Sequence, residues 1–306
     1  MTILLTGSTG FVGNHFLKHS SDIRRVVRSN TRCDLHSSRS FFEVDSICGN
    51  TDWSFAFDGI QTVIHLAGVV HNRKATPDSY QSVNVSGTIK LASDAAKAGV
   101  KRFVFVSTIL VNGSETKKTP FSPDMRVCPI NDYAKSKYDA ERMLKSISRE
   151  TGIEIVIVRP TLVYGPNAPG NFGLLTKVVK NLPFLPFGLI DNRRSFISVQ
   201  NLVDLLITCA THPKAAGCTF LASDGDSVSI KQFTNALAKG LGKKVVQLPI
   251  PIIFIRLLGK LFRKPELVEQ LCGDLEVDSS NLQQVLEWTP PLTMEQAMAS
   301  LIHSER

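Results

Sequence analysis

Short apolar runs alternate with longer amphipathic stretches through the first half of the chain. Apolar runs of this length are typical of strands buried on both faces of a parallel sheet. We expect strands at residues 2–6, 23–28, 62–66, 102–107 and 154–158. Helices are expected at residues 11–19, 79–98 and 131–150. The second helix should end at Gly99, because glycine is a common helix C-terminal residue. This alternation predicts an α/β fold with a doubly wound parallel sheet.

The pattern changes after Tyr164. Loop-forming glycines and prolines fill residues 165–170, and Pro183 and Pro186 interrupt the segment that follows. Shorter helices are expected at residues 201–211, 230–239 and 252–262. The second half of the chain is therefore predicted to be a mixture of short helices and isolated strands.

The length of 306 residues allows one large or two modest domains with a real core. We predict that residues 1–164 form the larger domain and that residues 196–224 return to it. The remainder of residues 165–306 would form a smaller, mixed α/β domain. We expect it to lie over the C-terminal edge of the sheet, where ligands of such sheets bind.

Composition narrows the class of protein. Hydrophobic residues make up 43% of the chain and charged residues 20%, the profile of a soluble globular protein. No apolar run reaches the ~18 residues needed to span a bilayer, and the N-terminus lacks a signal peptide. The six cysteines are scattered without C-x-x-C spacing, which argues against a metal site or a disulfide framework. We therefore expect a cytoplasmic protein with no metal and no integral membrane segment.

The net charge of +8 is compatible with nucleic acid, a membrane surface or an anionic small ligand as partner. The basic residues are dispersed, so no nucleic-acid partner is expected, and a phosphate-bearing substrate and cofactor would account for part of the excess. One stretch, residues 252–264, places Arg256, Lys260, Arg263 and Lys264 among apolar residues. It is typical either of an amphipathic helix on its own domain or of a helix on a membrane surface.

Three glycines join the first expected strand to the first expected helix. They allow a tight turn and a close approach of a pyrophosphate to the backbone, and the helix start supplies free N–H groups and a favourable dipole. Their spacing is G-x-x-G-x-x-G, and in this position it predicts a Rossmann-type dinucleotide site. The residues expected to contact the cofactor here are Gly7, Thr9, Gly10, Phe11, Val12 and Gly13.

The end of the second expected strand bears on which dinucleotide binds. An acidic residue there would bind the ribose 2′-hydroxyl of NAD, whereas an arginine accommodates the 2′-phosphate of NADP. The strand ends at Arg28 and Ser29, with Arg32 just beyond, and no acid occupies this position. We therefore predict NADP(H) in preference to NAD(H), with Arg28 as a contact.

A tyrosine and a lysine stand four residues apart on the helix expected at residues 131–150. Tyr133 and Lys137 therefore share one face of that helix and can reach one target. A phenol has a reference pKa of about 10, and a nearby ammonium lowers it by favouring the phenolate. The pair can thus exchange a proton with a substrate oxygen.

Further segments along essentially the whole chain match one family. They lie at residues 65–68, 84–88, 159–166, 194–199, 201–204 and 286–290. Together with the glycine turn, with Ser107 and Thr108, and with the Tyr133/Lys137 pair, they make the chain resemble the extended short-chain dehydrogenase/reductases. Among these it is most similar to the sugar-nucleotide epimerase/dehydratase family.

The resemblance implies a Thr/Tyr/Lys catalytic set. Thr108 would hydrogen-bond the reacting oxygen, Tyr133 would be the general acid/base, and Lys137 would hold the nicotinamide ribose and lower the pKa of Tyr133. The further cofactor contacts that it implies are Asp45, Leu66, Ala67, Gly68 and Asn84.

The resemblance also implies contacts to a UDP-sugar. Asn171 and Arg194 match family positions that face the diphosphate and uridine, and the fork of donors on arginine suits phosphate. Many family members carry an arginine shortly before the Gly-Asp that here is Gly273-Asp274. This chain lacks it, and Arg263 is the upstream candidate to replace it. The two longest predicted helices form a dimer interface in relatives, which implies a homodimer.

The residues after Thr108 bear on which reaction follows. A 4,6-dehydratase of this family carries an Asp-Glu pair there, whereas this chain has Ile109-Leu110, which cannot transfer protons. C4 epimerisation with tightly bound NAD and 4-keto reduction by NADPH both remain, and the missing acid near Arg28 favours reduction. The pattern looks closest to bacterial O-antigen proteins that reduce UDP-4-keto-6-deoxy-HexNAc sugars towards UDP-N-acetylquinovosamine. A UDP-glucose or UDP-HexNAc 4-epimerase is the alternative, and a steroid-type reductase and a non-catalytic dinucleotide sensor are more remote.

Overall fold

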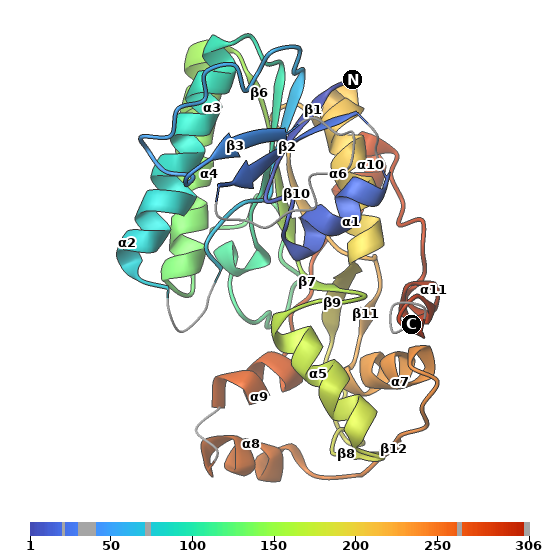
Figure 1. Ribbon diagram of the computed structural model, residues 1–306. Helices are drawn as coiled ribbons and strands as arrows, with labels where there is room; N and C mark the ends of the chain where they lie inside the picture. The colour runs from blue at the N-terminus through green and yellow to red at the C-terminus, as the bar shows by residue number, and fades with distance from the viewer. Residues whose placement is uncertain (20–21, 30–40, 71–74, 262–264, 303–306) are drawn as a thin grey trace.

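A seven-stranded parallel sheet forms the centre of the protein (Figure 1). The structure is a computed structural model, and it describes residues 1–19, 22–29, 41–70, 75–261 and 265–302. The strand order is β10-β6-β5-β4-β1-β2-β3. The strands are β1 (Ile3–Thr6), β2 (Ile23–Arg28), β3 (Phe41–Val44), β4 (Thr62–His65), β5 (Arg102–Val106), β6 (Glu154–Pro160) and β10 (Thr219–Ala222). The predicted doubly wound parallel sheet is confirmed.

Helices cover both faces of this sheet, because successive strand residues point to opposite sides. Leu4 of β1 packs with α3 (Thr88–Lys97) and α4 (Asp132–Thr151) in one apolar cluster. Its neighbours Ile3 and Leu5 pack with α1 (Phe11–His19), α6 (Val199–Thr211) and α10 (Ser280–Leu286) in the other. All three strand side chains are buried, and burying each contributes about 1.5–3 kcal/mol.

The helix predicted at residues 79–98 is the largest local difference from expectation. It consists of a short α2 (Pro77–Ser79), an eight-residue π-helix η1 (Tyr80–Gly87) and α3. A π-helix shifts the side-chain register, and it is frequent at functional sites. Here it carries the buried Asn84, one of the predicted cofactor contacts. The prediction also missed β3 and β10, the two edge strands of the sheet.

The second half of the chain builds a smaller lobe below the sheet (Figure 1). Its centre is an aromatic cluster in which Phe196 and Phe233 stack with ring centroids 3.9 Å apart. Its strands are β7 (Leu162–Tyr164), β8 (Phe184–Leu185), β9 (Arg194–Ser198), β11 (Ser227–Val228) and β12 (Val246–Gln247). Its helices are α5 (Gly170–Asn181), α7 (Ile230–Gly240), α8 (Ile252–Leu261), α9 (Pro265–Cys272) and α11 (Met294–Ala299).

The segment at residues 196–224 divides between the two lobes. Its helix α6 and strand β10 join the main sheet, whereas β9 pairs with β7 and β11 in the smaller lobe. The two single turns η2 (Ile109–Val111) and η3 (Pro213–Ala215) complete the element order. None of the helices, over the part of the chain that is described, is long and apolar enough to cross a membrane.

Candidate active site

The glycine turn is closed by backbone contacts that leave no room for side chains. Gly7 follows β1 with a φ of +70°, and a Cβ added there would lie 2.7 Å from the backbone nitrogen of Ala67. A Cβ on Gly13 would overlap the carbonyl oxygen of Gly7. Gly10 donates its N–H to that same carbonyl at 3.0 Å. The turn therefore presses the start of α1 against the end of β4, a cradle that fits a dinucleotide pyrophosphate.

The remaining predicted residues of the turn follow directly from this geometry. Thr9 is exposed in the turn, and Phe11 and Val12 open α1. Leu66 and Ala67 follow β4, next to Gly7. The sheet therefore gathers these positions at one edge, the carboxyl ends of β1 and β4.

The ends of β2 and β3 place an acid beside the predicted NADP contact. Arg28 is exposed at the end of β2, where it is paired in register with Val44 of β3. Ser29 donates its hydroxyl to Asp45 Oδ1 at 2.9 Å. The guanidinium of Arg28 and the carboxylate of Asp45 therefore both lie where β2 and β3 end. Arg32 lies outside the described residues.

Gly68, Asn84 and Lys137 meet at the end of β4. A Cβ on Gly68 would lie 3.0 Å from Asn84 Oδ1 and 3.3 Å from Lys137 Nζ. Asn84 Oδ1 accepts the N–H of Val69 at 2.8 Å, and Asn84 Nδ2 donates to Ser136 Oγ at 3.0 Å. The π-helix and α4 are thereby fastened to the strand end, and three predicted cofactor contacts come together.

The helix α4 holds Lys137 in a buried position. The side chain of Asn131 caps its N-terminus by accepting the N–H of Ala134 at 2.8 Å. Lys137 Nζ donates to the carbonyl oxygen of Val106 at 3.0 Å and lies 4.7 Å from the ring centroid of Phe105. Burial lowers the pKa of Lys137 to about 8, against an opposing effect of Glu141.

Tyr133 differs from the prediction in its acidity. Burial and the neighbouring Tyr80, whose ring centroid is 6.2 Å away, raise the pKa of Tyr133 to about 12. The expectation that Lys137 lowers this pKa is wrong for this geometry. The reason is that the Lys137 ammonium donates to Val106 while burial favours the neutral phenol.

Thr108 follows β5 and caps the single turn η2. Its Oγ1 accepts the N–H of Leu110 at 3.3 Å. Ile109 is buried in an apolar cluster with Leu221, Leu275 and Val277. The position after Thr108 therefore carries packing residues and no group that could transfer a proton.

A buried polar network below Thr108 was missed at the sequence level. Glu141 accepts from Arg159 Nε at 3.0 Å and from the hydroxyl of Ser107, and Arg159 Nη1 donates to Asn112 Oδ1 at 3.0 Å. All four side chains are buried. Glu141 stands one helical turn after Lys137, and Arg159 interrupts an apolar strand. These two positions could have indicated the network from the sequence, because a buried charge needs a partner.

Asn171 and Arg194, which were predicted to face the diphosphate and uridine, both form hydrogen bonds at or just after α9. Arg194 of β9 is buried, and its Nη1 donates to the carbonyl oxygen of Gly273 at 2.8 Å. Burial lowers the pKa of Arg194 to about 10. Asn171 is exposed at the start of α5 and donates to Gln270 Oε1 at 2.8 Å. Arg263, the candidate replacement for the missing family arginine, lies outside the described residues.

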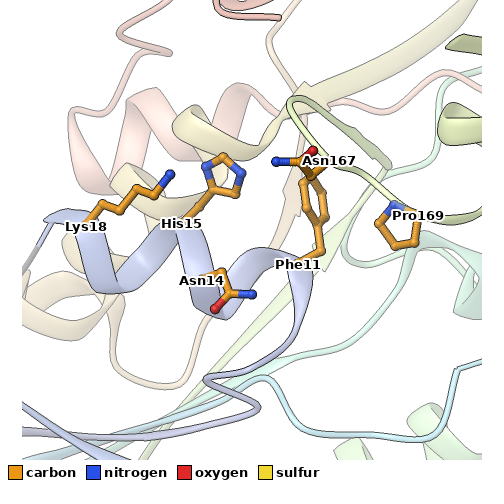
Figure 2. Close-up of a pocket in the computed structure, with 6 residues that line it drawn as sticks. All are labelled: Phe11, Asn14, His15, Lys18, Asn167 and Pro169. Atoms are coloured by element: carbon orange, nitrogen blue, oxygen red, sulfur yellow. The ribbon is translucent and has the colours of Figure 1, made fainter. Parts of the chain in front are cut away.

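A separate cavity of about 290 Å³ lies along the outer side of α1 (Figure 2). It shares Phe11 with the glycine turn but contains none of Thr108, Tyr133 and Lys137. His15 in its wall contacts the carbonyl oxygen of Pro166 through Nε2 at 3.2 Å. The residues that line it are Phe11, Asn14, His15, Lys18, Asn167 and Pro169.

Comparison with known proteins agrees with this geometry. Residues 3–220 match the NAD dependent epimerase/dehydratase family. The chain is 42% identical over 306 residues to UDP-glucose 4-epimerase from Vibrio cholerae, covering 96% of this chain and 92% of that protein. It is 25% identical over 319 residues to N-acetyl-alpha-D-glucosaminyl-diphospho-ditrans,octacis-undecaprenol 4-epimerase from Escherichia coli O157:H7, covering 99% and 95%.

Solved structures share the fold at lower sequence identity. UDP-N-acetylglucosamine 4-epimerase from Bacillus cereus superposes with a TM-score of 0.79 at 17% identity, covering 100% of this chain and 99% of that one. The Bordetella bronchiseptica enzyme WbmG in complex with NAD and UDP gives a TM-score of 0.75 at 20% identity, covering 99% and 93%. At such identities the likeness shows the fold alone.

Proposed function

Because the chain belongs to the NAD dependent epimerase/dehydratase family, we propose that it transfers hydride at C4 of a UDP-sugar. The observation that carries this proposal is the position of Lys137. Its ammonium lies against both the end of β5 and Gly68 at the end of β4. Tyr133 stands one turn before Lys137 on α4, and this spacing supports a shared target for the two side chains.

Two side chains would act on the substrate oxygen, and a third would hold the cofactor. Nicotinamide supplies the acceptor and donor of the C4 hydride when it is bound. Tyr133 would take the proton from the C4 hydroxyl and return it, while the Thr108 hydroxyl donates a hydrogen bond to the same oxygen. Lys137 would hold the nicotinamide ribose beside Tyr133, from its buried position at the end of β5.

Arg194 would hold the diphosphate of the substrate. It is buried, and the hydrogen bond to Gly273 is the one that its side chain makes within the described residues. Burial of a guanidinium is costly, and an anionic ligand offsets that cost. Asn171 would contribute from the start of α5.

Epimerisation at C4 is the reaction that we favour. The relative that supports it is the Vibrio cholerae protein at 42% identity, which is named for UDP-glucose 4-epimerisation. The buried Ile109 after Thr108 also leaves no acid/base pair for the elimination of water. An epimerase oxidises C4 and then reduces the ketone on its other face, so it consumes no cofactor.

A 4-keto reduction of a UDP-4-keto-6-deoxy-HexNAc sugar by NADPH is the second candidate. Arg28 at the end of β2 favours it, because an arginine there suits the 2′-phosphate. Asp45 beside Ser29 weighs in the other direction, because an acid there suits the 2′-hydroxyl of NAD. Arg28 and Asp45 thus favour different dinucleotides, and the choice of NADP(H) over NAD(H) belongs to the proposed reduction.

One assay separates these reactions. Purified protein is incubated with UDP-glucose, UDP-GlcNAc or a UDP-4-keto-6-deoxy-HexNAc, each with and without added NADH or NADPH, and the sugars are followed by NMR. We expect a C4 epimer to form without added cofactor. Stoichiometric consumption of NADPH would instead assign the reductase. Tight dinucleotide binding without turnover of any of the three sugars would contradict both and favour a sensor.

A further inference from the structure

The far end of the smaller lobe carries a surface of large apolar side chains. The paired strands β8 and β12 and the helix α8 all lie at this end of the lobe, away from the main sheet (Figure 1). Each contributes exposed apolar residues, where a water-facing surface is normally mixed. We call the following residues the apolar end face: Leu182, Phe184, Val246, Leu248, Ile253, Phe254, Leu257 and Leu261.

The helix α8 is apolar on both of its sides. Ile255 is buried and Ile252 partly buried in the core of the smaller lobe. On the other side, Phe254, Leu257 and Leu261 recur at helical spacing, and their exposed fractions lie between 56% and 73%. A helix on its own domain in water presents a polar outer face. The outer side of α8 therefore exposes large apolar side chains beside two basic residues, Arg256 and Lys260, while its inner side packs into the lobe.

The segments that form this face carry basic residues and no acidic ones. Residues 171–190 and 239–261 contain no Asp or Glu. Their basic residues are Lys177, Lys180, Lys239, Lys243, Lys244, Arg256 and Lys260. Arg256 pairs with Glu269 of α9, whereas Lys177, Lys243, Lys244 and Lys260 are exposed and form no ion pair within the described part of the chain.

We propose that the apolar end face docks on the surface of a bilayer that contains anionic lipids. Exposed apolar side chains on a helix flanked by lysines match the two components of such a surface, the acyl boundary and the anionic headgroups. A second copy of the chain fits less well, because it would bring two rims of like charge together. The protein would lie on the membrane through α8, β8 and β12.

Docking at this face would bear on the substrate side of the active site. The helix α9 packs against α8 and is followed by Gly273, whose carbonyl accepts the hydrogen bond from Arg194. The helix α9 would therefore connect the membrane-bound α8 to the proposed diphosphate site. The docking itself does not depend on which reaction that site performs.

Vesicle sedimentation tests the proposal. The full chain is mixed with phosphatidylcholine vesicles, or with vesicles in which about one third of the lipid is phosphatidylglycerol. We expect sedimentation with the anionic vesicles, weakening as salt is raised. The variant F254S/L257S should bind at least about tenfold more weakly. The matched control is Phe55→Ser, since Phe55 is 81% exposed on the larger lobe.

The charge component is tested separately. The variant K243Q/K244Q should lose about fivefold in vesicle affinity for each lysine removed, because a lysine near an anionic surface contributes about 1 kcal/mol. K117Q/K118Q, an exposed adjacent pair elsewhere, should leave the affinity unchanged.

Equal binding by F254S/L257S and the parent would overturn the proposal, as would absence of sedimentation of the parent. Loss of a dimer in F254S/L257S by light scattering, without vesicle binding by the parent, would assign the face to a second copy instead.

Discussion

Two ion pairs of the same chemistry sit in opposite surroundings in this protein. Glu141 and Arg159 lie inside the larger lobe, with side chains almost completely buried and further bonds to Ser107 and Asn112. Arg256 and Glu269 join α8 to α9 in the smaller lobe, where both are about half exposed, at 47% and 54%. The first pair supports the side of the site that carries Tyr133 and Lys137, and the second lies beside the substrate side.

The surroundings decide what each pair does. A buried pair has given up its hydration, so either partner left alone becomes an uncompensated charge. The Glu141–Arg159 pair therefore ties α4 to β6, and the bond from Ser107 to Glu141 ties it to the end of β5, so the catalytic helix is held in one place. An exposed pair is screened by water and contributes little. The buried pair therefore specifies the position of the helix that carries the proton-transfer groups, whereas the exposed pair adds little to the packing of α8 on α9.

The largest expected effect comes from breaking the buried pair. Glu141→Ala should lower the free energy of unfolding by about 3–5 kcal/mol, because Arg159 is left buried without its carboxylate. The matched change in the exposed pair, Glu269→Ala, should cost about 0–1 kcal/mol. Chemical denaturation of both variants measures the difference. Equal losses in the two variants would remove the contrast between the lobes.

Arg194 tests the substrate side at an intermediate magnitude. Arg194→Gln should raise KM for the UDP-sugar about tenfold with little change in kcat, because it removes a contact made equally in the ground and transition states. Its neighbour Arg193 is exposed and paired with Glu276, so Arg193→Gln is the control and should leave KM unchanged. A KM for Arg194→Gln equal to that of the parent would mean that the substrate carries no diphosphate at this position.

The smallest effect is a pH dependence from Lys137. Its pKa is about 8 in the folded protein against an ordinary 10.5, so above pH 8 the unfolded chain binds more protons than the folded one. The free energy of unfolding should therefore rise with pH, by about 1 kcal/mol between pH 8 and 9 from this group. Lys137→Met should lack this contribution. Parallel pH profiles for parent and variant would show that Lys137 is not desolvated.

Local signals made the fold predictable where strands are short and apolar. The helix α1 was predicted with its observed bounds, because glycines precede it and its apolar face is regular. The edge strand β3 was missed, since Phe41 at the edge is exposed and β3 lacks a continuous apolar run. The π-helix was also missed, because hydrophobic spacing alone does not distinguish a wider turn over eight residues.

Site residues were predictable where one element carries them, and less so where a contact joins distant segments. Tyr133 and Lys137 share a helix, so their common face follows from spacing. Glu141 and Arg159 come from different elements, and their pairing needs the packed structure. The raised pKa of Tyr133 likewise depends on burial, which a sequence pattern does not specify. The homodimer remains a prediction.

The central claim is that Tyr133 moves the proton on the C4 oxygen. The most direct test is the rate of UDP-galactose formation from UDP-glucose by the parent and by Tyr133→Phe, with dinucleotide binding measured on both. We predict that the variant binds the dinucleotide normally and loses about 10²- to 10⁴-fold in rate, the usual contribution of a general acid/base. A rate for Tyr133→Phe within about twofold of the parent would contradict the claim.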